Sequence, residues 1–396
     1  MNIALCYESV LPAKGGAETY IGDLSRRLDQ DGHEVHLYAC RWDADSLPKS
    51  MVFHQLPPIT GPRFLRPWRF GSAVEEALLG SKHNVTVGFD KTWGQDVLYP
   101  QGGLHAASQR HNRRKERTGL RRFFATGLKY LDLAFHSFRK LEQKQYCSGL
   151  GSTVVVNSAM VRKHFEQYLP LSPAPAAVIH SAIDPNRFVQ PDRDAIRAVE
   201  RGSWNLSAGE AVGLFVGMNY RLKGLEPLIR SLVHLPPSLS FTLVVVGHAK
   251  FEKYRELAEL LGVEDRIRFL GHRNNPKSAY HAADFLIHPT FYDPCSLVAL
   301  EALACGLPVL TTQYNGASEL LDIPMNGLVM NDPHDGPALA KAISTMADKK
   351  YLEQARPAAL AAAQRWTFEM HYSALMEVFT KVANRKMPPT GVEPVT

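Results

Sequence analysis

The sequence predicts an α/β protein made of two doubly wound domains, each built on a parallel sheet. Short apolar strands alternate with helical segments in two separate series, and parallel strands need such crossover helices. A polar, strand-poor stretch at 184–211 separates the series and suits a linker. The chain of 396 residues also exceeds the length at which one hydrophobic core stops growing.

The first domain is expected to span residues 1–190. An apolar strand at 3–7 leads through a loop with Pro and Gly into a helix at 17–28, whose apolar residues recur at helical spacing. A strand at 35–39 completes this βαβ unit. The remaining predicted elements are strands at 85–88, 153–156 and 177–179 and a helical, cation-rich stretch at about 110–147.

The second domain is expected to span residues 191–370 and repeats the same alternation. Its predicted strands cover 212–216, 241–246, 267–270, 284–288 and 308–311. Its predicted helices cover 225–233, 250–261 and 297–304, and another begins at Pro337. Residues 371–396 are expected to form a helix that crosses back to the first domain, followed by a disordered tail with Pro and Gly.

Composition excludes several classes of protein. With 45% hydrophobic and 21% charged residues, the chain is neither disordered nor collagen-like. It has no run of 18 apolar residues and no basic, apolar leader, which predicts a protein that is neither secreted nor membrane-spanning. The five cysteines are odd in number and lack metal-binding spacing, so we expect reduced, mostly buried thiols in a cytoplasmic protein.

The net charge of +6 is concentrated in one segment. Residues 110–122, in the first domain, carry seven cations and one anion, and the rest of the chain is balanced. The segment lacks the interleaved aromatic residues of nucleic-acid-binding surfaces. We expect Arg113, Arg114 and Lys115 to contact an anionic membrane or a phosphorylated lipid-linked acceptor, with a solvated helix face as the alternative. The predicted location is therefore peripheral, on the cytoplasmic face of the inner membrane.

A pair of carboxylates marks the predicted site. Asp293 lies on the loop after the strand at 284–288, and Glu301 lies in the following helix. Ser296 is a candidate N-cap of that helix, whose unpaired amides and dipole suit an anionic phosphate. In isolation, Asp293 would be a turn residue and Glu301 a solvated one. However, Glu301 is embedded among apolar residues in SLVALEALACG, and such an acid usually has a partner.

The run YDPCSLVALEALACGLPVLTT resembles the donor-site signature of the family 4 retaining glycosyltransferases, in which seven residues separate two acidic ones. The resemblance covers nearly the whole chain, through KGGAE, VVNSAMVRKHF, IHSAIDPNRF, VGMNYRLKGLEPLI and IRFLGH. It implies the GT-B fold, in which two Rossmann-like domains face each other across a cleft. Residues 88–106 are most similar to family members that add glucose to the lipopolysaccharide core.

The resemblance assigns donor-binding roles to the acidic motif. Glu301 is implied to bind the ribose hydroxyls, and Asp293 those of the transferred hexose. The implied backbone contacts to diphosphate and sugar come from Cys295, Ser296, Leu297 and Val298. The family usually has Glu where this chain has Asp293, so the resemblance leaves the sugar preference open.

Two cations are implied to face the leaving group. Arg221 and Lys223 follow the strand at 212–216, where they would neutralise a departing nucleoside diphosphate. Without the resemblance they would be read as solvated surface residues. Members of the family often have another Arg where this chain has Met218. Either Arg221 takes the role of that Arg, or the role is unfilled in this chain.

Four further residues complete the implied site. Gly15 and Gly16 allow close approach of the donor to the backbone, although a turn alone would explain them. His105 is implied to face the donor sugar, with a surface histidine as the alternative. His272, after Gly271, matches the loop that recognises the nucleotide base.

These features together predict a hexosyltransferase that retains anomeric configuration. The expected donor is a nucleoside-diphosphate sugar, UDP-linked, and the acceptor is a glycan or glycolipid hydroxyl in lipopolysaccharide or surface-polysaccharide synthesis. The family's front-face route assigns no enzymic base, and no metal cofactor is expected because no DxD-type cluster follows a strand. Two alternatives stay open: a nucleotide-sugar epimerase, and a sugar-nucleotide-binding module that has lost catalysis.

Overall fold

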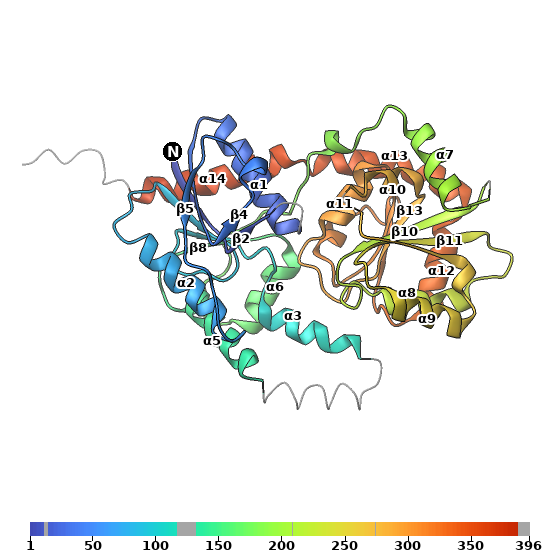
Figure 1. Ribbon diagram of the computed structural model, residues 1–396, viewed down its shortest axis with the longest axis horizontal. Helices are drawn as coiled ribbons and strands as arrows, with labels where there is room; N and C mark the ends of the chain where they lie inside the picture. The colour runs from blue at the N-terminus through green and yellow to red at the C-terminus, as the bar shows by residue number, and fades with distance from the viewer. Residues whose placement is uncertain (12–14, 117–131, 208, 274, 387–396) are drawn as a thin grey trace, which may run out of the picture. The chain divides into compact units, whose positions relative to one another are not determined.

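The computed structural model describes residues 1–11, 15–116, 132–207, 209–273 and 275–386. The chain forms two compact units (Figure 1). The first contains Met1–Gln109, Phe123–Ile179 and Met370–Thr396, and the second contains Arg110–Arg122 and His180–Glu369. The cationic segment 110–122 thus groups with the second unit rather than the first. The tail predicted to be disordered, 387–396, lies outside the described residues.

The first unit is built on a parallel sheet of seven strands in the order β5-β3-β1-β6-β7-β8-β9. In its centre, Leu5 of β1 lies between Leu37 of β3 and Val87 of β6. The strands are β1 (Asn2–Cys6), β3 (Glu34–Ala39), β5 (Val52–Gln55), β6 (Val85–Gly88), β7 (Val97–Leu98), β8 (Thr153–Val156) and β9 (Ala177–Val178). A separate small parallel sheet pairs β2 (Ser9–Val10) with β4 (Arg41–Trp42).

Helices from both ends of the chain pack on the first sheet. Near the N-terminus, α2 buries Phe70 against Ala4 of β1. From the C-terminus, α14 brings the His371 ring nitrogen Nε2 to 2.8 Å from the Tyr20 hydroxyl of α1. The helices lying wholly or partly in this unit are α1 (Gly16–Gln30), α2 (Arg66–Ala77), α3 (His105–Asn112), α5 (Leu133–Cys147), α6 (Ala159–Tyr168) and α14 (Phe368–Lys386).

The second unit repeats this plan with six parallel strands in the order β12-β11-β10-β13-β14-β15. They are β10 (Ala211–Gly217), β11 (Phe241–Gly247), β12 (Ile267–Gly271), β13 (Phe285–His288), β14 (Val309–Thr312) and β15 (Gly327–Met330). One face is covered by α7 (Arg193–Ser203), α10 (Lys277–Ala282), α11 (Leu297–Ala304) and α13 (Lys349–Arg365), and the other by α8 (Leu225–Ser231), α9 (Glu252–Leu261) and α12 (Gly336–Met346) (Figure 1). Because apolar side chains pack on both faces, β11 is buried along its whole length. The predicted α/β fold class is therefore confirmed.

The predicted linker at 184–211 is instead ordered within the second unit. It holds a 3-10 turn, Pro185–Phe188, with Phe188 buried, and helix α7. The prediction failed because the side of α7 that meets α10 carries Arg197 and Arg201, which bond the Ala282 carbonyl, rather than an apolar stripe.

Two class predictions can be compared with the described residues. All five cysteines are free, and all but Cys147 are buried, as expected for reduced thiols. Among the described helices, none combines the length and the apolar character needed to cross a bilayer.

Candidate active site

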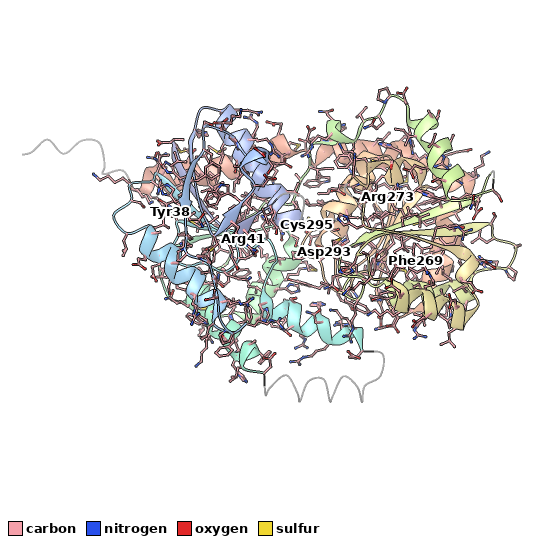
Figure 2. All side chains as sticks on the ribbon, viewed as in Figure 1. Tyr38, Arg41, Phe269, Arg273, Asp293 and Cys295 are labelled. Atoms are coloured by element: carbon pink, nitrogen blue, oxygen red, sulfur yellow. The ribbon has the colours of Figure 1, made fainter. Side chains whose placement is uncertain are left out.

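Charged side chains meet at the carboxyl edge of the second sheet, where the strand order reverses. The chain leaves β10 toward β11 and β12, and later leaves β13 toward β14 and β15. Loops that diverge in this way open a crevice between their strands, the usual ligand site of such sheets. Lys223, after β10, forms an ion pair there with Asp293, after β13. Figure 2 shows Asp293 and Cys295 close together on this loop.

The loops after β10 and β13 are bonded to each other. The Leu222 carbonyl accepts hydrogen bonds from the Phe291 amide at 2.9 Å and from the Thr290 hydroxyl at 3.1 Å. Gly224 has a φ of +82°, and a Cβ there would lie 2.0 Å from the Pro289 carbonyl oxygen. Only glycine fits this close approach, which holds Lys223 at its distance from Asp293.

Asp293 is held as a buried carboxylate with 8% of its surface exposed. Burial would by itself raise the pKa of Asp293, but the Lys223 ammonium and His288 outweigh it and keep the pKa well below its usual range. The His288 ring nitrogen Nε2 lies 3.3 Å from Oδ2 of Asp293. Burial lowers the pKa of His288, so a neutral ring can donate Nε2–H to the carboxylate. Asp293 is therefore an ionised acceptor beside a cation.

A third loop fixes the position of Asp293. The Asp293 amide donates to the Tyr314 carbonyl, and the Gly316 amide donates to the Asp293 carbonyl, both at 2.9 Å. Asn315 is fully buried, and its Oδ1 accepts the Ser296 amide at 3.2 Å. The segment after β14 thus orients the whole turn from Asp293 to Ser296.

Glu301 projects from α11 next to α10. Its Oε2 accepts a hydrogen bond of 2.6 Å from the Tyr280 hydroxyl, and its Oε1 has no hydrogen-bond partner among the described residues. Burial raises the pKa of Glu301, against the effect of Tyr280. Because Glu301 remains half-buried rather than enclosed, its second oxygen is open to a hydroxyl-bearing ligand.

The N-terminus of α11 differs from the prediction in one respect. Ser296 occupies the N-cap position, but its hydroxyl makes no capping hydrogen bond. Its own amide is held by Asn315 instead. The helix start, whose dipole favours anions, is therefore not blocked by a serine oxygen. Burial raises the pKa of the adjacent Cys295 thiol to about 12, so that side chain stays neutral.

Comparison with known families agrees with this geometry. Residues 14–187 match the family described as Glycosyltransferase Family 4, and residues 197–366 match Glycosyl transferases group 1. The chain belongs to glycosyltransferase family 4. It is therefore a glycosyltransferase that uses a nucleotide sugar, as the sequence predicts.

This glycosyltransferase has relatives that match most of its length. It is 26% identical over 335 residues to the lipopolysaccharide glucosyltransferase WaaG of Escherichia coli K12, covering 84% of this chain and 86% of WaaG. The crystal structure of WaaG matches with a TM-score of 0.73 at 25% identity, over 98% of this chain and 100% of WaaG. Sucrose-phosphate synthase of Thermosynechococcus elongatus (TM-score 0.77, 20% identity, 97% and 100% covered) and Anabaena HepE with UDP-glucose (0.71, 18%, 96% and 100%) share the GT-B fold.

In the glycosyltransferase, Arg221 has no described contact with Asp293. It forms an ion pair with Glu116 and is 57% exposed. Nearby in the same unit, Arg114 packs against Tyr314, with its guanidinium 4.6 Å from the ring centroid and a 2.8 Å bond to the hydroxyl. Part of the cationic segment thus borders the loop that orients Asp293, and the leaving-group role of Arg221 stays a prediction.

The other predicted residues belong to other segments of the chain. Gly15 is the N-cap of α1, Gly16 begins that helix, and His105 begins α3 with its ring stacked 4.3 Å from Phe138. All of these belong to the first unit, and their donor contacts stay predictions. His272 is exposed after β12 in the second unit, and its contact with the base also stays a prediction.

Sequence reasoning missed three residues that support the site. His288 and Asn315 fix Asp293, and Tyr280 bonds Glu301. His288 was the only one with a local signal, since a histidine ending an apolar strand places an imidazole at the catalytic edge. The other two act across distant segments of the chain.

Glu142, which bonds the start of α3, is expected to make the stability of the fold depend on pH. This buried residue accepts the amides of His105 and Ala106, and burial raises its pKa to about 7. As the pH rises, the unfolded chain therefore releases the Glu142 proton near pH 4.5, whereas the folded form holds it until about pH 7. We expect this group's stabilisation to be present below pH 4.5 and lost as the pH rises through 7, by up to about 3 kcal/mol.

Urea unfolding at several pH values tests this expectation. Glu142→Gln should remove the loss of stability between pH 4.5 and 7, whereas Glu76→Gln, at an exposed site in α2, should retain it. Equal pH dependence in Glu142→Gln and in the unsubstituted enzyme would contradict the assignment.

Proposed function

We propose that this glycosyltransferase transfers a hexose from a UDP-sugar, with retention of anomeric configuration, to a hydroxyl of a glycan or glycolipid. The main support for the proposal is the ion pair of Lys223 with Asp293 at the carboxyl edge of the second sheet, where the strand order reverses. It combines an acceptor for sugar hydroxyls with a cation for a diphosphate. The likeness to WaaG supports a role in lipopolysaccharide or surface-polysaccharide synthesis, and HepE was solved with UDP-glucose.

Each candidate site residue of the second unit has a distinct proposed role. Asp293 accepts hydrogen bonds from the hexose, and Oε1 of Glu301 accepts those of the ribose. Backbone amides at the start of α11 meet the diphosphate. Lys223, joined by Arg221 when Glu116 releases it, stabilises the charge that develops as the glycosidic C–O bond breaks. The departing phosphate oxygen takes the acceptor proton on the same face, so no side chain serves as base.

Transfer assays with a donor panel test the proposed function. We would incubate the enzyme with UDP-glucose, UDP-galactose or GDP-mannose and glycolipid from a strain lacking its gene, and assign the new linkage by NMR. Hexose transfer with retention, unaffected by EDTA, is the expected result. Release of an epimeric donor without acceptor would instead establish the epimerase. Turnover no faster than that of Asp293→Ala across the panel would establish the binding module.

A peripheral position on the cytoplasmic face of the inner membrane is the proposed location. The cationic segment supports it, since each cation near an anionic surface contributes about 1 kcal/mol. We expect vesicles with anionic lipid to bind the enzyme, less so at high salt, and substitution of Arg113, Arg114 and Lys115 by Gln to abolish binding. The matched control replaces the exposed Lys49, Lys82 and Lys350. Binding that is insensitive to salt, or equal loss in the control, would contradict the prediction.

A further inference from the structure

A cavity of about 410 Å³ lies at the opposite edge of the second sheet from Asp293. Its floor is formed by Ala211, the first residue of β10, and Asp284, which directly precedes β13. One wall is formed by α7, and the other by one face of α13. The site is thus separated from the donor chemistry by the length of the strands.

The walls present cations that are one helical turn apart on α7 and two turns apart on α13. Arg197 and Arg201 lie four residues apart on α7, and Lys349 and Arg356 lie seven apart on α13. These spacings put each pair on one face of its helix. Such alignment of cations toward a shared cavity is costly unless anions compensate them.

One buried carboxylate forms ion pairs with three of these cations. Asp284 is 4% exposed and pairs with Arg197 at 2.6 Å, Arg356 at 2.9 Å and Arg201 at 3.3 Å. A fourth arginine, Arg193, is close enough that Arg356 and Arg197 add to the effect of burial in lowering its pKa. Its Nη2 is buried and has no hydrogen-bond partner among the described residues. Positive charge therefore exceeds what Asp284 neutralises.

Two further carboxylates, Glu210 and Glu353, reduce this excess. Glu210 accepts the Ser207 amide and the Thr242 hydroxyl and keeps a negative charge that also acts on Arg201. Glu353 and Lys349 are both exposed, so solvent screens both of their charges. The lining therefore holds four cations against three carboxylates, a balance of one positive charge.

A purely structural role accounts for only part of the cluster. Arg197 and Arg201 bond carbonyls at the end of α10, with distances of 2.8 and 3.2 Å to Ala282. Arg356, in contrast, uses only Nη2 in the described contacts, and Lys349 has no described partner. These two side chains keep donors for a ligand.

We propose that this cavity binds a phosphomonoester group through Arg356 and Lys349, with Arg197 and Arg201 behind them. A guanidinium fork beside an ammonium suits the three oxygens and double charge of a phosphate. The remaining volume admits the carbon skeleton that carries the phosphate. This site goes beyond the proposed transfer reaction and does not depend on it.

Calorimetric titration with glycerol 1-phosphate, at ionic strength balanced by chloride, tests the proposal. We expect Lys349→Gln and Arg356→Gln to weaken binding at least about tenfold, the loss of one charge-assisted contact. The exposed neighbour Lys350 provides the matched control as Lys350→Gln, and Lys223→Met reports binding at the donor site. Both should bind as the unsubstituted enzyme does. Lys349 has no contact with Asp284, so its variant stays informative if Arg356→Gln fails to fold.

The titrations distinguish failure of the proposal from the two possible sources of the phosphate. Absence of binding, unchanged binding in Lys349→Gln, or loss in Lys223→Met would overturn the proposal. Competition by phosphatidic acid vesicles, but not by phosphatidylcholine vesicles, would assign the phosphate to a lipid headgroup. Binding of glycerol 1-phosphate without that competition would assign it to a soluble compound.

Discussion

Replacing Lys223 with methionine is expected to lower kcat about 10²- to 10³-fold, because a group that stabilises developing charge in a water-poor site contributes roughly 3–4 kcal/mol. Methionine keeps much of the side-chain length but removes the ammonium that pairs with Asp293. It also removes the charge that, with His288, holds the pKa of Asp293 down against burial. The proposed contact with the leaving group and the carboxylate proposed to bind the sugar should therefore both be affected.

Two measurements check this expectation. Steady-state transfer rates should fall for Lys223→Met and stay unchanged for Lys250→Met, an exposed lysine on the loop after β11. A depressed pKa means that Asp293 stabilises the fold above its unfolded pKa of 3.8 and loses this effect as the pH falls. Acid unfolding of Lys223→Met should show less of that loss, since its Asp293 starts from a higher pKa. A variant that keeps half of the kcat would refute the assignment.

Replacing Glu301 with glutamine is expected to weaken UDP binding by about 10- to 100-fold, because hydrogen bonds to a charged group contribute roughly 1.5–3 kcal/mol. Glutamine retains the shape of the side chain and one acceptor but loses the charge of Oε1. Burial raises the pKa of Glu301, so the affinity of the unsubstituted enzyme for UDP should fall as the pH decreases toward that pKa. Glu301→Gln should lose this pH dependence.

Calorimetry with UDP at several pH values separates the role of Glu301 from that of its neighbour. Tyr280→Phe keeps the ring and removes only the hydroxyl that bonds Oε2. We expect a smaller loss of affinity there and a retained pH dependence. If Glu301→Gln binds UDP as tightly as the unsubstituted enzyme, the ribose contact is wrong.

Local patterns predicted the sheets well where strands are buried on both sides. The short, Val-rich apolar runs at β10 and β11 are typical of strands buried on both faces, and the helices that follow show 3.6-residue periodicity. Strands β2, β4, β5, β7 and β15 were missed because two residues, or four at an edge, carry too little pattern. Helix α7 was missed because ion pairs and carbonyl bonds replace apolar packing there.

The residues of the candidate site also divide into those that a local motif predicts and those that depend on contacts between distant segments. Asp293, Glu301 and Lys223 stand in local motifs, and the structure brings Lys223 to Asp293 across 70 residues of chain. The support by Asn315 depends on a fold in which the loops after β13 and β14 touch. The partner of Arg221 is Glu116, 105 residues away, and no motif relates them.

The packing of α14 on the first unit has a consequence for biosynthesis. Ribosomes make β1 and α1 first, yet the Tyr20 hydroxyl gains its His371 partner, and Asp31 gains the Tyr372 hydroxyl, only when the last helix emerges. The second unit, whose segment 180–369 is already complete by then, can finish folding earlier. Translation therefore completes the two units in the reverse of the order in which it begins them, and a nascent chain that stalls before residue 370 leaves the first unit without its last helix.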